Sequence, residues 1–278
     1  MATVLALSSL VSRGHVGLSA ITPALQWLGH EVIALPTILL SNHPGHPYAA
    51  GAPLPPEQLE AMLAALDANG WLATVDAVLT GYQPSKAHVS FAVSLVDLVK
   101  RRRPDALFFC DPVIGDTPPG LYIDPAAARA IRDELLPKAA YASPNAFELG
   151  WLSDRPVTDA ASAIEAARAL PVAATLVTSV PAAGASLANI LVTEATAYVC
   201  VVPHKVSVPN GTGDFMMAVF VAECLTSPDP GSNPQKCLGR AVSATAALIA
   251  ASAGKDELAL VSAADHWHTA APLTVKMM

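Results

Sequence analysis

A short glycine-rich segment in the last third of the chain carries residues that could bind phosphate and move a proton. Asn210-Gly211-Thr212-Gly213-Asp214 stands directly before the apolar run 215–222, which is typical of a helix. Glycines let the backbone turn tightly and present several N–H groups in one direction, and a helix N-terminus adds its own free N–H groups. We therefore expect a site for a small anion, most often phosphate.

Asp214 does not fit an anion site alone, because a carboxylate repels phosphate. It fits a general base that removes a proton from the hydroxyl that receives a phosphoryl group. An anion site together with a base indicates a kinase that acts on a small alcohol. The segment taken alone is equally typical of a simple helix start, since Asp is common in first turns and glycine-rich turns precede many helices.

Two further segments combine carboxylates with a strand end. Asp111-Pro-Val-Ile-Gly-Asp116 follows an apolar predicted strand, and its two carboxylates could hold a magnesium–phosphate group through waters. Ser143-Pro-Asn-Ala-Phe-Glu148 follows another predicted strand, and Glu148 could reach a metal-bound water beside Asn145. Both segments also have an ordinary interpretation, as a turn rich in Asp, Pro and Gly and as a helix start with an Asn cap and a first-turn acid.

Aromatic and hydroxyl side chains follow other predicted strands. Tyr82 could stack on a ligand ring, and Thr178 and Ser179 could contact phosphate; a half-buried strand-end tyrosine and a local cap are the alternatives. His43 lies in a long loop, where a histidine is usually only solvated. Ligands of open α/β sheets bind beyond the carboxyl ends of the strands, so these groups mark that edge as the expected site.

The segments between the motifs predict strands that alternate with helices, which favours an α/β fold with a mostly parallel sheet covered on both faces. No repeat or linker divides the chain, so we expect a single domain over residues 1–278, with a lid-like loop at about 41–56 that is rich in Pro, Gly and His. The predicted strands are 3–8, 31–35, 76–80, 106–111, 139–143, 174–178 and a hairpin of 188–192 with 197–202. The predicted helices are 17–28, 57–69, 85–102 (with Ser85 as its cap), 125–135, 146–152, 158–170, 213–225, 234–253 and a short one at 261–268.

Composition and charge exclude several classes of protein. Of the 278 residues, 53% are hydrophobic and 14% charged, which suits a large core and indicates some buried subunit surface. The formal charge of −7 argues against a nucleic-acid binder, and the one basic run, 101–103, ends a predicted helix, where cations suit the dipole. The sequence has no P-loop and no glycine-rich dinucleotide fingerprint, so a nucleotide would be held in another way.

The cysteines and the apolar segments indicate the compartment. Cys110, Cys200, Cys224 and Cys237 form no CxxC pair and stand in apolar surroundings, so we expect buried, reduced thiols. The N-terminus has no basic region before its first apolar segment, and the most apolar helix, 241–253, is too short and too rich in Ser, Thr and Ala to span a bilayer. We expect a cytoplasmic protein with no membrane partner.

Taken in order, the motifs resemble those of the pyridoxal kinase family, within the ribokinase-like superfamily. The resemblance covers nearly the whole chain, and its N-terminal half is the part typical of the pyridoxal branch. The segments that carry it are Val11-Ser-Arg-Gly-His-Val-Gly17, Leu28-Gly-His-Glu-Val32, Leu40-Ser-Asn-His43, Gly81-Tyr82 with Ser85, Cys110–Asp116 with Leu121-Tyr122, Ser143–Glu148 and Gly211–Asp214.

The resemblance implies a three-layer α/β/α ribokinase-like fold with a mostly parallel central sheet. It implies phosphorylation of the 5′-hydroxyl of pyridoxal, and often of pyridoxine or pyridoxamine, with ATP and a divalent metal such as Mg²⁺. Members of the family are usually homodimers and are often helped by K⁺. The implied partners are therefore a pyridoxal-type small molecule, ATP and a second copy of the chain.

The resemblance also implies roles for individual residues. Asp214 would be the base, and Gly211, Thr212 and Gly213 would form the anion hole for the transferring phosphoryl group. The substrate ring would lie against Ser9, His43 and Tyr82. The metal and phosphate side would use Asp111, Asp116, Ser143, Asn145 and Glu148, with Asp111 and Glu148 serving the metal and Tyr122, Thr178 and Ser179 near the nucleotide.

Several residues depart from the family pattern, mostly on the substrate side. Leu18 stands where the family has Asn, and Pro44 stands where it commonly has Thr. Other departures are His46-Pro47-Tyr48, Gln83-Pro84, Met216 and Met217. The transfer chemistry is therefore better supported than the identity of the alcohol. The alternatives are a related kinase of hydroxymethylpyrimidine or a sugar, and a non-catalytic protein that binds vitamin B6 or a nucleotide.

Overall fold

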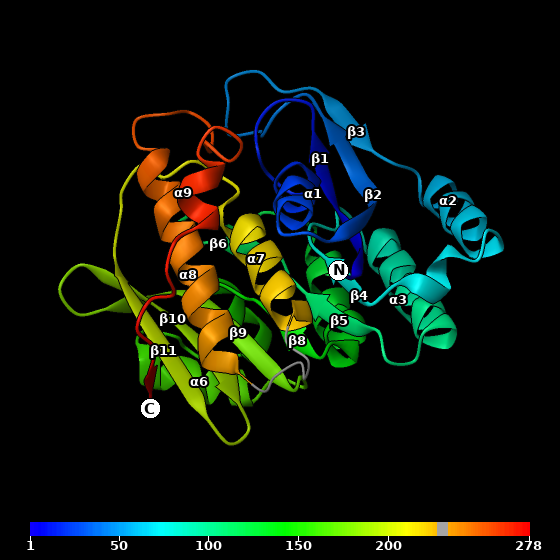
Figure 1. Cartoon of the computed structure of the whole chain (residues 1–278). Helices are drawn as coiled ribbons and strands as arrows, with labels where there is room; N and C mark the ends of the chain where they lie inside the picture. The colour runs from blue at the N-terminus through cyan, green and yellow to red at the C-terminus, as the bar shows by residue number, and fades with distance from the viewer. Residues whose placement is uncertain (227–232) are drawn as a thin grey trace.

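A ten-stranded sheet runs through the middle of the molecule in the computed structural model, which describes residues 1–226 and 233–278 (Figure 1). The strand order is β12-β11-β10-β9-β8-β5-β4-β1-β2-β3, and the block from β2 to β9 is parallel. The strands are β1 (Thr3–Val11), β2 (Glu31–Leu40), β3 (Gly51–Pro53), β4 (Ala77–Thr80), β5 (Leu107–Cys110), β8 (Tyr141–Ala142), β9 (Ala174–Ala182), β10 (Ser186–Thr193), β11 (Ala197–Pro203) and β12 (Lys276–Met277).

Helices cover both faces of this sheet. On one face α2 (Pro56–Ala68), α3 (Lys86–Arg102), α4 (Pro125–Ala130), α5 (Ala146–Ser153) and α6 (Ala160–Arg168) bury their apolar sides. On the other face lie α1 (Leu18–Trp27), α7 (Thr212–Thr226), α8 (Pro234–Ala251) and α9 (Ala264–His268). This arrangement confirms the predicted three-layer α/β/α fold with a mostly parallel sheet.

The alternation of side chains along each strand divides the core in two. In β1, Leu5 and Leu7 pack under the helices of one face, whereas Val4 and Ala6 pack under those of the other. Successive side chains of a strand point to opposite faces, so a strand with a helical layer on each side must be apolar throughout. That requirement is why the sequence shows continuous apolar runs at these strands.

Several predicted boundaries differ from the structure. The prediction that the strand 174–178 ends at Thr178 is wrong, because β9 continues to Ala182 and pairs antiparallel with β10. Ser85 precedes α3 but makes no capping bond, and its hydroxyl instead lies 2.8 Å from Nδ1 of His88. The predicted helix 125–135 becomes a π-helix at Ile131–Leu135.

Short elements escaped prediction because two to four residues carry no periodic signal. They are the strands β3 and β12, the ribbon of β6 (Gly115–Asp116) with β7 (Gly120–Leu121), and the 3₁₀ turns Trp71–Thr74 and Leu136–Lys138. The predicted helix 261–268 is confirmed only over Ala264–His268.

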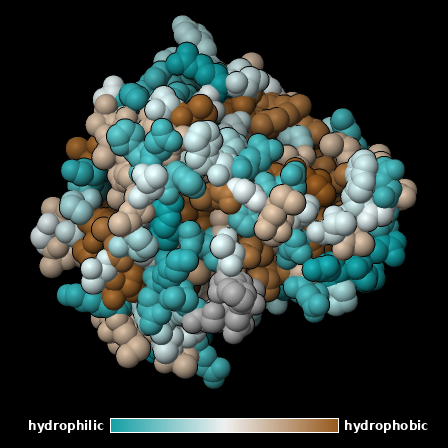
Figure 2. Space-filling model, viewed as in Figure 1, coloured by the Kyte–Doolittle hydropathy of each residue, from teal (hydrophilic) through white to brown (hydrophobic). Residues whose placement is uncertain are grey.

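The cysteines and the basic run also agree with the prediction from sequence. All four cysteines are free and buried, as predicted. The basic run ends α3, where Arg102 pairs with Asp67 at 2.6 Å and Arg103 pairs with Asp76 at 3.1 Å. Figure 2 shows hydrophilic side chains gathered at the top of the molecule, over the loop that joins β2 to β3 in Figure 1. Within the part of the chain that the structure describes, no helix has both the length and the apolarity needed to cross a membrane.

Candidate active site

The predicted polar groups meet at the carboxyl ends of the parallel strands. Backbone hydrogen bonds continue past the strand ends and hold these segments side by side: Gly81 N–H donates to the Leu7 carbonyl at 2.8 Å, and Asp111 N–H to the Thr80 carbonyl at 2.8 Å. Asn145 and Thr178 form a further parallel bridge. The edge that the sequence marked as the site is therefore a continuous surface of strand ends.

The anion loop, residues 210–214, is held by its contact with the loop 12–17. Gly211 has a φ of +96°, and a Cβ there would lie 1.9 Å from the carbonyl oxygen of His15. Only glycine fits this position. The N–H of Gly17 donates to the carboxylate of Asp214, which stands in the first turn of α7. The loop 12–17 thus positions both the anion loop and the predicted base.

Three carboxylates share the site, and the charges of two of them, Glu148 and Asp214, oppose the ionisation of the third, Asp111. Burial raises the pKa of Asp214 to about 6, although the N–H groups of Gly17 and of Asp214 itself hold it lower than burial alone would. Burial also raises the pKa of Asp111 well above its usual range, and the charges of Glu148 and Asp214 raise it further. Tyr122 lies near the same charges. Burial raises the pKa of its hydroxyl, and the charge of Glu148 raises it further.

Glu148 holds two segments together. It is 3% exposed, and its carboxylate accepts N–H bonds from Ile114 at 2.8 Å, Gly115 at 3.4 Å and Asn145 at 2.9 Å. Burial raises its pKa to about 7, and these N–H groups limit the rise. The bonds fasten the loop 111–116 to the start of α5, where Asn145 and Glu148 form a capping box. Val113, directly before Ile114 in this loop, has a φ of +34°, which is strained for a β-branched residue.

The donor set fits a metal that is shared with phosphate. Among residues 1–226 and 233–278, no group of three or more His, Cys, Asp or Glu side chains is arranged to hold a metal ion. Mg²⁺ typically uses one or two carboxylates and completes its shell with waters and substrate phosphates. Asp111, partly exposed beside the buried Glu148, fits that description, and a cation there would relieve the repulsion between the carboxylates.

On the substrate side, the predicted residues come from the end of β1 and from two loops. Ser9 is partly exposed and packs against Gly17, where a Cβ would lie 2.2 Å from its hydroxyl. Tyr82 is half-buried; its N–H donates to the hydroxyl of Ser8 at 3.2 Å. His43 lies next to the anion loop, because its Nδ1 is 3.2 Å from the side-chain nitrogen of Asn210.

On the nucleotide side, Thr178 and Ser179 lie at an irregularity inside β9. Ser179 has a φ of +59°, and its N–H donates to the side-chain oxygen of Asn189 at 3.4 Å. The parallel pairing of β9 ends at the bridge between Thr178 and Asn145, although β9 itself continues and pairs with β10. Tyr122 is 48% exposed, and Asp116, also exposed, accepts the N–H of Thr117 at 2.7 Å.

Four of the departures from the family pattern are buried: Gln83, which is 0% exposed, and three apolar residues of the core. Leu18 is 2% exposed, and Met216 and Met217 are buried beside it under the sheet. The exposed departures are Pro44, Pro47 and Tyr48, all in the loop 41–50. No role was predicted from the sequence for Gly17, Asn189 or Glu257, because their contacts run through the backbone or join distant segments. Of the three, only Gly17 had a local signal, as a glycine at the start of a predicted helix.

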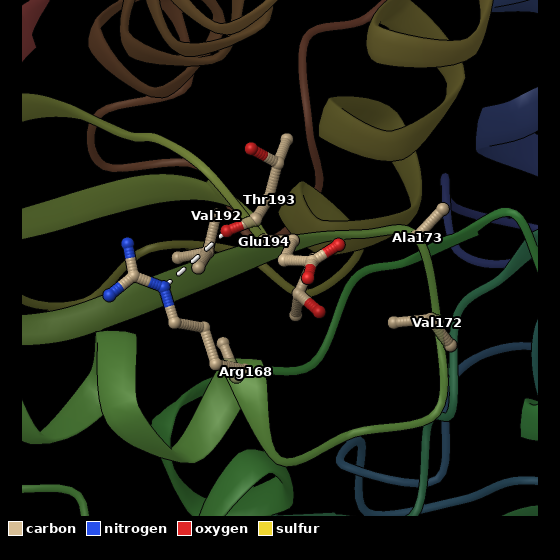
Figure 3. A pocket seen from close by; sticks show the side chains of 8 residues that line it. Arg168, Val172, Ala173, Val192, Thr193 and Glu194 are labelled. Atoms are coloured by element: carbon tan, nitrogen blue, oxygen red, sulfur yellow. Dashed lines mark hydrogen bonds between the residues drawn. The ribbon is translucent and has the colours of Figure 1, made fainter.

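Two hollows lie away from this edge. The first, about 280 Å³, is shown in Figure 3 between the end of α6 and the start of β9, where Arg168 Nε lies 3.5 Å from the carbonyl of Thr193. The second, about 540 Å³, lies between the end of α8 and α9. None of the predicted site residues lines either hollow.

Comparison with known proteins decides the family. Residues 117–260 match the family model described as pfkB family carbohydrate kinase. A pyridoxal kinase of Leifsonia xyli subsp. xyli is 32% identical over 272 residues, 95% of either chain. The chain belongs to the pyridoxal kinase family. A pyridoxine/pyridoxal/pyridoxamine kinase of Bordetella bronchiseptica is 35% identical over 80% of this chain and 81% of that protein.

The solved structures agree with this membership. A pyridoxal kinase from Leishmania donovani in complex with ADP and pyridoxamine superposes with a TM-score of 0.92 at 31% identity, covering 99% of either chain. The similarity therefore extends through both the parallel block of the sheet and its antiparallel extension. The family match and this superposition support the ribokinase-like fold that the motifs predicted.

We predict that Gly211 and Gly213 respond oppositely to substitution. Gly211→Ala places a methyl group against the His15 carbonyl and forces an L residue to a φ of +96°, so it should destabilise the protein by about 1–3 kcal/mol. Gly213→Ala is the matched control: its Cβ meets no atom within 4 Å, and Ala in a helix should be neutral or stabilising by up to about 1 kcal/mol. Urea unfolding of both variants measures the difference, and equal midpoints would contradict it.

Proposed function

We propose that this protein transfers the γ-phosphoryl group of ATP to the 5′-hydroxyl of pyridoxal, and also of pyridoxine and pyridoxamine. The relatives named pyridoxal kinase support the reaction, and the Leishmania donovani structures in complex with ADP, alone and with pyridoxamine, support both ligand classes. The observation that carries the proposal is Asp214, with its raised pKa, at the N-terminus of α7 beside the anion loop.

In this mechanism Asp214 accepts the proton of the attacking hydroxyl. Its pKa of about 6 leaves it ionised at neutral pH yet more basic than an ordinary aspartate, which suits a general base. The N–H of Gly17 fixes the carboxylate, so the base is aimed before substrate binds. Catalysis would then rest mostly on positioning and charge stabilisation.

The anion loop stabilises the transferring group. The N–H groups of Gly211, Thr212 and Gly213 belong to the start of α7, which begins at Thr212; the first N–H groups of a helix have no partner within the helix, and the helix dipole adds positive potential there. Asp111, Asp116, Ser143, Asn145 and Glu148 would serve the metal and phosphates. Bound Mg²⁺ would supply the positive charge that neutralises the phosphate oxygens. Tyr122, Thr178 and Ser179 would contact the nucleotide.

The remaining features of the proposal concern the substrate side and assembly. Ser9, His43 and Tyr82 would hold the pyridine ring, and the loop 41–56 would act as a lid within a single domain. We also propose a cytoplasmic homodimer activated by K⁺; the exposed apolar side chain of Leu39 on β2, next to the edge strand β3, supports a subunit contact. Light scattering of the purified protein tests the dimer.

We expect ATP turnover with Mg²⁺, K⁺ and pyridoxal to yield a phosphorylated pyridoxal that mass spectrometry identifies. Asp214→Asn should lower kcat by roughly 10²–10⁴-fold while leaving pyridoxal affinity in place, because it removes the base but keeps the shape. Its Tm at pH 7.5 should not fall, since burial disfavours the charged carboxylate. Asp105→Asn makes the same chemical change at an exposed position and serves as control.

Other outcomes of that assay separate the alternatives. Turnover with hydroxymethylpyrimidine or a sugar but not with pyridoxal would keep the mechanism and change the substrate. Tight pyridoxal binding without turnover of any alcohol would support a non-catalytic binding protein. The altered loop at Pro44 is the feature that motivates this alternative. Near wild-type rates in Asp214→Asn would remove Asp214 from the mechanism.

The rate should depend on pH through Asp214. Its carboxyl is protonated below a pH of about 6 and can no longer accept a proton, so kcat/KM should fall about tenfold per pH unit below that point and level off above it. A pH series of kcat/KM with saturating Mg²⁺ measures this limb. A profile that is flat from pH 5 to 8 would contradict the assignment of the base.

A further inference from the structure

The loop that joins β2 to β3 is fastened to the site at two histidines. The N–H of Gly45 donates to Nδ1 of His43 at 3.0 Å, and the side-chain nitrogen of Asn210 lies 3.2 Å from the same atom. A backbone N–H can only donate, so Nδ1 is the unprotonated nitrogen of this ring. The first fastening therefore ties the loop to the residue that begins the anion loop.

The second fastening joins the loop to a residue more than two hundred positions away. His46 Nε2 lies 3.1 Å from Oε1 of Glu257, in the segment between α8 and α9. Figure 1 shows the two loops side by side at the top of the molecule. The Glu257 side chain is 16% exposed, so its carboxylate has few solvent contacts to replace a lost partner.

Glu257 also contacts the loop that positions the base. Its carboxylate packs on Gly14, where a Cβ would lie 2.4 Å from Oε2. It is also near His15: burial lowers the pKa of His15, and the charge of Glu257 opposes that change. The carbonyl of His15 contacts Gly211, so one carboxylate supports the β2–β3 loop and the loop 12–17 together.

The neighbouring acid provides a contrast. Asp256 pairs with Arg13 at 3.2 Å, but the two side chains are 67% and 73% exposed. Such solvent-exposed pairs contribute little, because water and salt screen them. Asp256 and Glu257 thus both contact the loop 12–17. Only Glu257, which is mostly buried, makes contacts that water cannot readily replace.

We propose that Glu257 is a positioning residue for phosphoryl transfer: through His46 and Gly14 it holds the β2–β3 loop and the loop 12–17 against the anion loop and Asp214. This inference rests on the proposed kinase function. Glu257 itself has no contact with the proposed reacting groups. Held in this way, the β2–β3 loop would enclose the acceptor alcohol and keep water from the phosphoryl group.

The test combines loop exchange and kinetics in His46→Ala, Glu257→Ala and the double variant, with Asp256→Asn as the matched control. In hydrogen exchange of the ligand-free protein, residues 41–50 should lose protection in both single variants, with no further loss in the double variant. The KM for pyridoxal should rise on the order of threefold to tenfold with kcat less affected, and ATP hydrolysis without acceptor should increase. Asp256→Asn should change neither readout.

Several results would overturn the inference. Unchanged exchange of residues 41–50 in His46→Ala, a surface-loop substitution that leaves the core intact, would show that the contact does not hold the loop. Effects of the two single substitutions on KM that multiply in the double variant would show that His46 and Glu257 act independently. If the wild-type protein phosphorylates no pyridoxal, the proposed function fails, while the exchange experiment still decides whether Glu257 holds the loop.

Discussion

Repulsion among crowded carboxylates, of which Glu148 is buried and Asp111 and Asp214 are partly exposed, is the constraint on which this site depends. Asp111, Glu148 and Asp214 share one edge of the sheet, and burial raises the pKa of each. Charges of one sign in a poorly solvated place are costly unless hydrogen bonds hold them. Here the compensation comes from backbone N–H groups, which reach Glu148 from two segments and Asp214 from Gly17. Backbone donors carry no flexible side chain, so they also keep the carboxylates in place.

This compensation explains the unusual backbone around the site. The turns that bring N–H groups to these carboxylates include Gly17 at a positive φ and the strained Val113, and Gly211 beside them also has a positive φ. Each conformation is maintained by contacts with a neighbouring loop and not by its own sequence alone. The site is thus rigid where charge must be placed, and the cost in local strain is met by the packed sheet beneath it.

The two sides of the site differ in how far they resemble a wider family. The match to the carbohydrate kinase model covers residues 117–260, which include Asn145, Glu148 and the anion loop but not Asp111 or Asp116, nor Ser9, His43 or Tyr82. Phosphate and metal impose the same charge problem whatever the alcohol is, so this side has little freedom to vary. The acceptor side is built from loops, and there the exposed departures of this chain, among them Pro44 and Tyr48, are found.

The sequence by itself determined the layers of the fold and the set of site residues proposed for catalysis. Continuous apolar runs indicate strands that are buried on both faces. Polar residues directly after those runs indicate a site at the carboxyl edge of the sheet. Both inferences use only neighbouring residues. Local pattern could not show that Glu148 faces N–H groups of Ile114 and Gly115, that β9 continues past Ser179 with the help of Asn189, or that Leu18 is a core residue. Nor could it place Glu257 beside His46 and Gly14. Those contacts join segments separated by tens to hundreds of residues, and only the packing of the whole sheet and its loops brings them together.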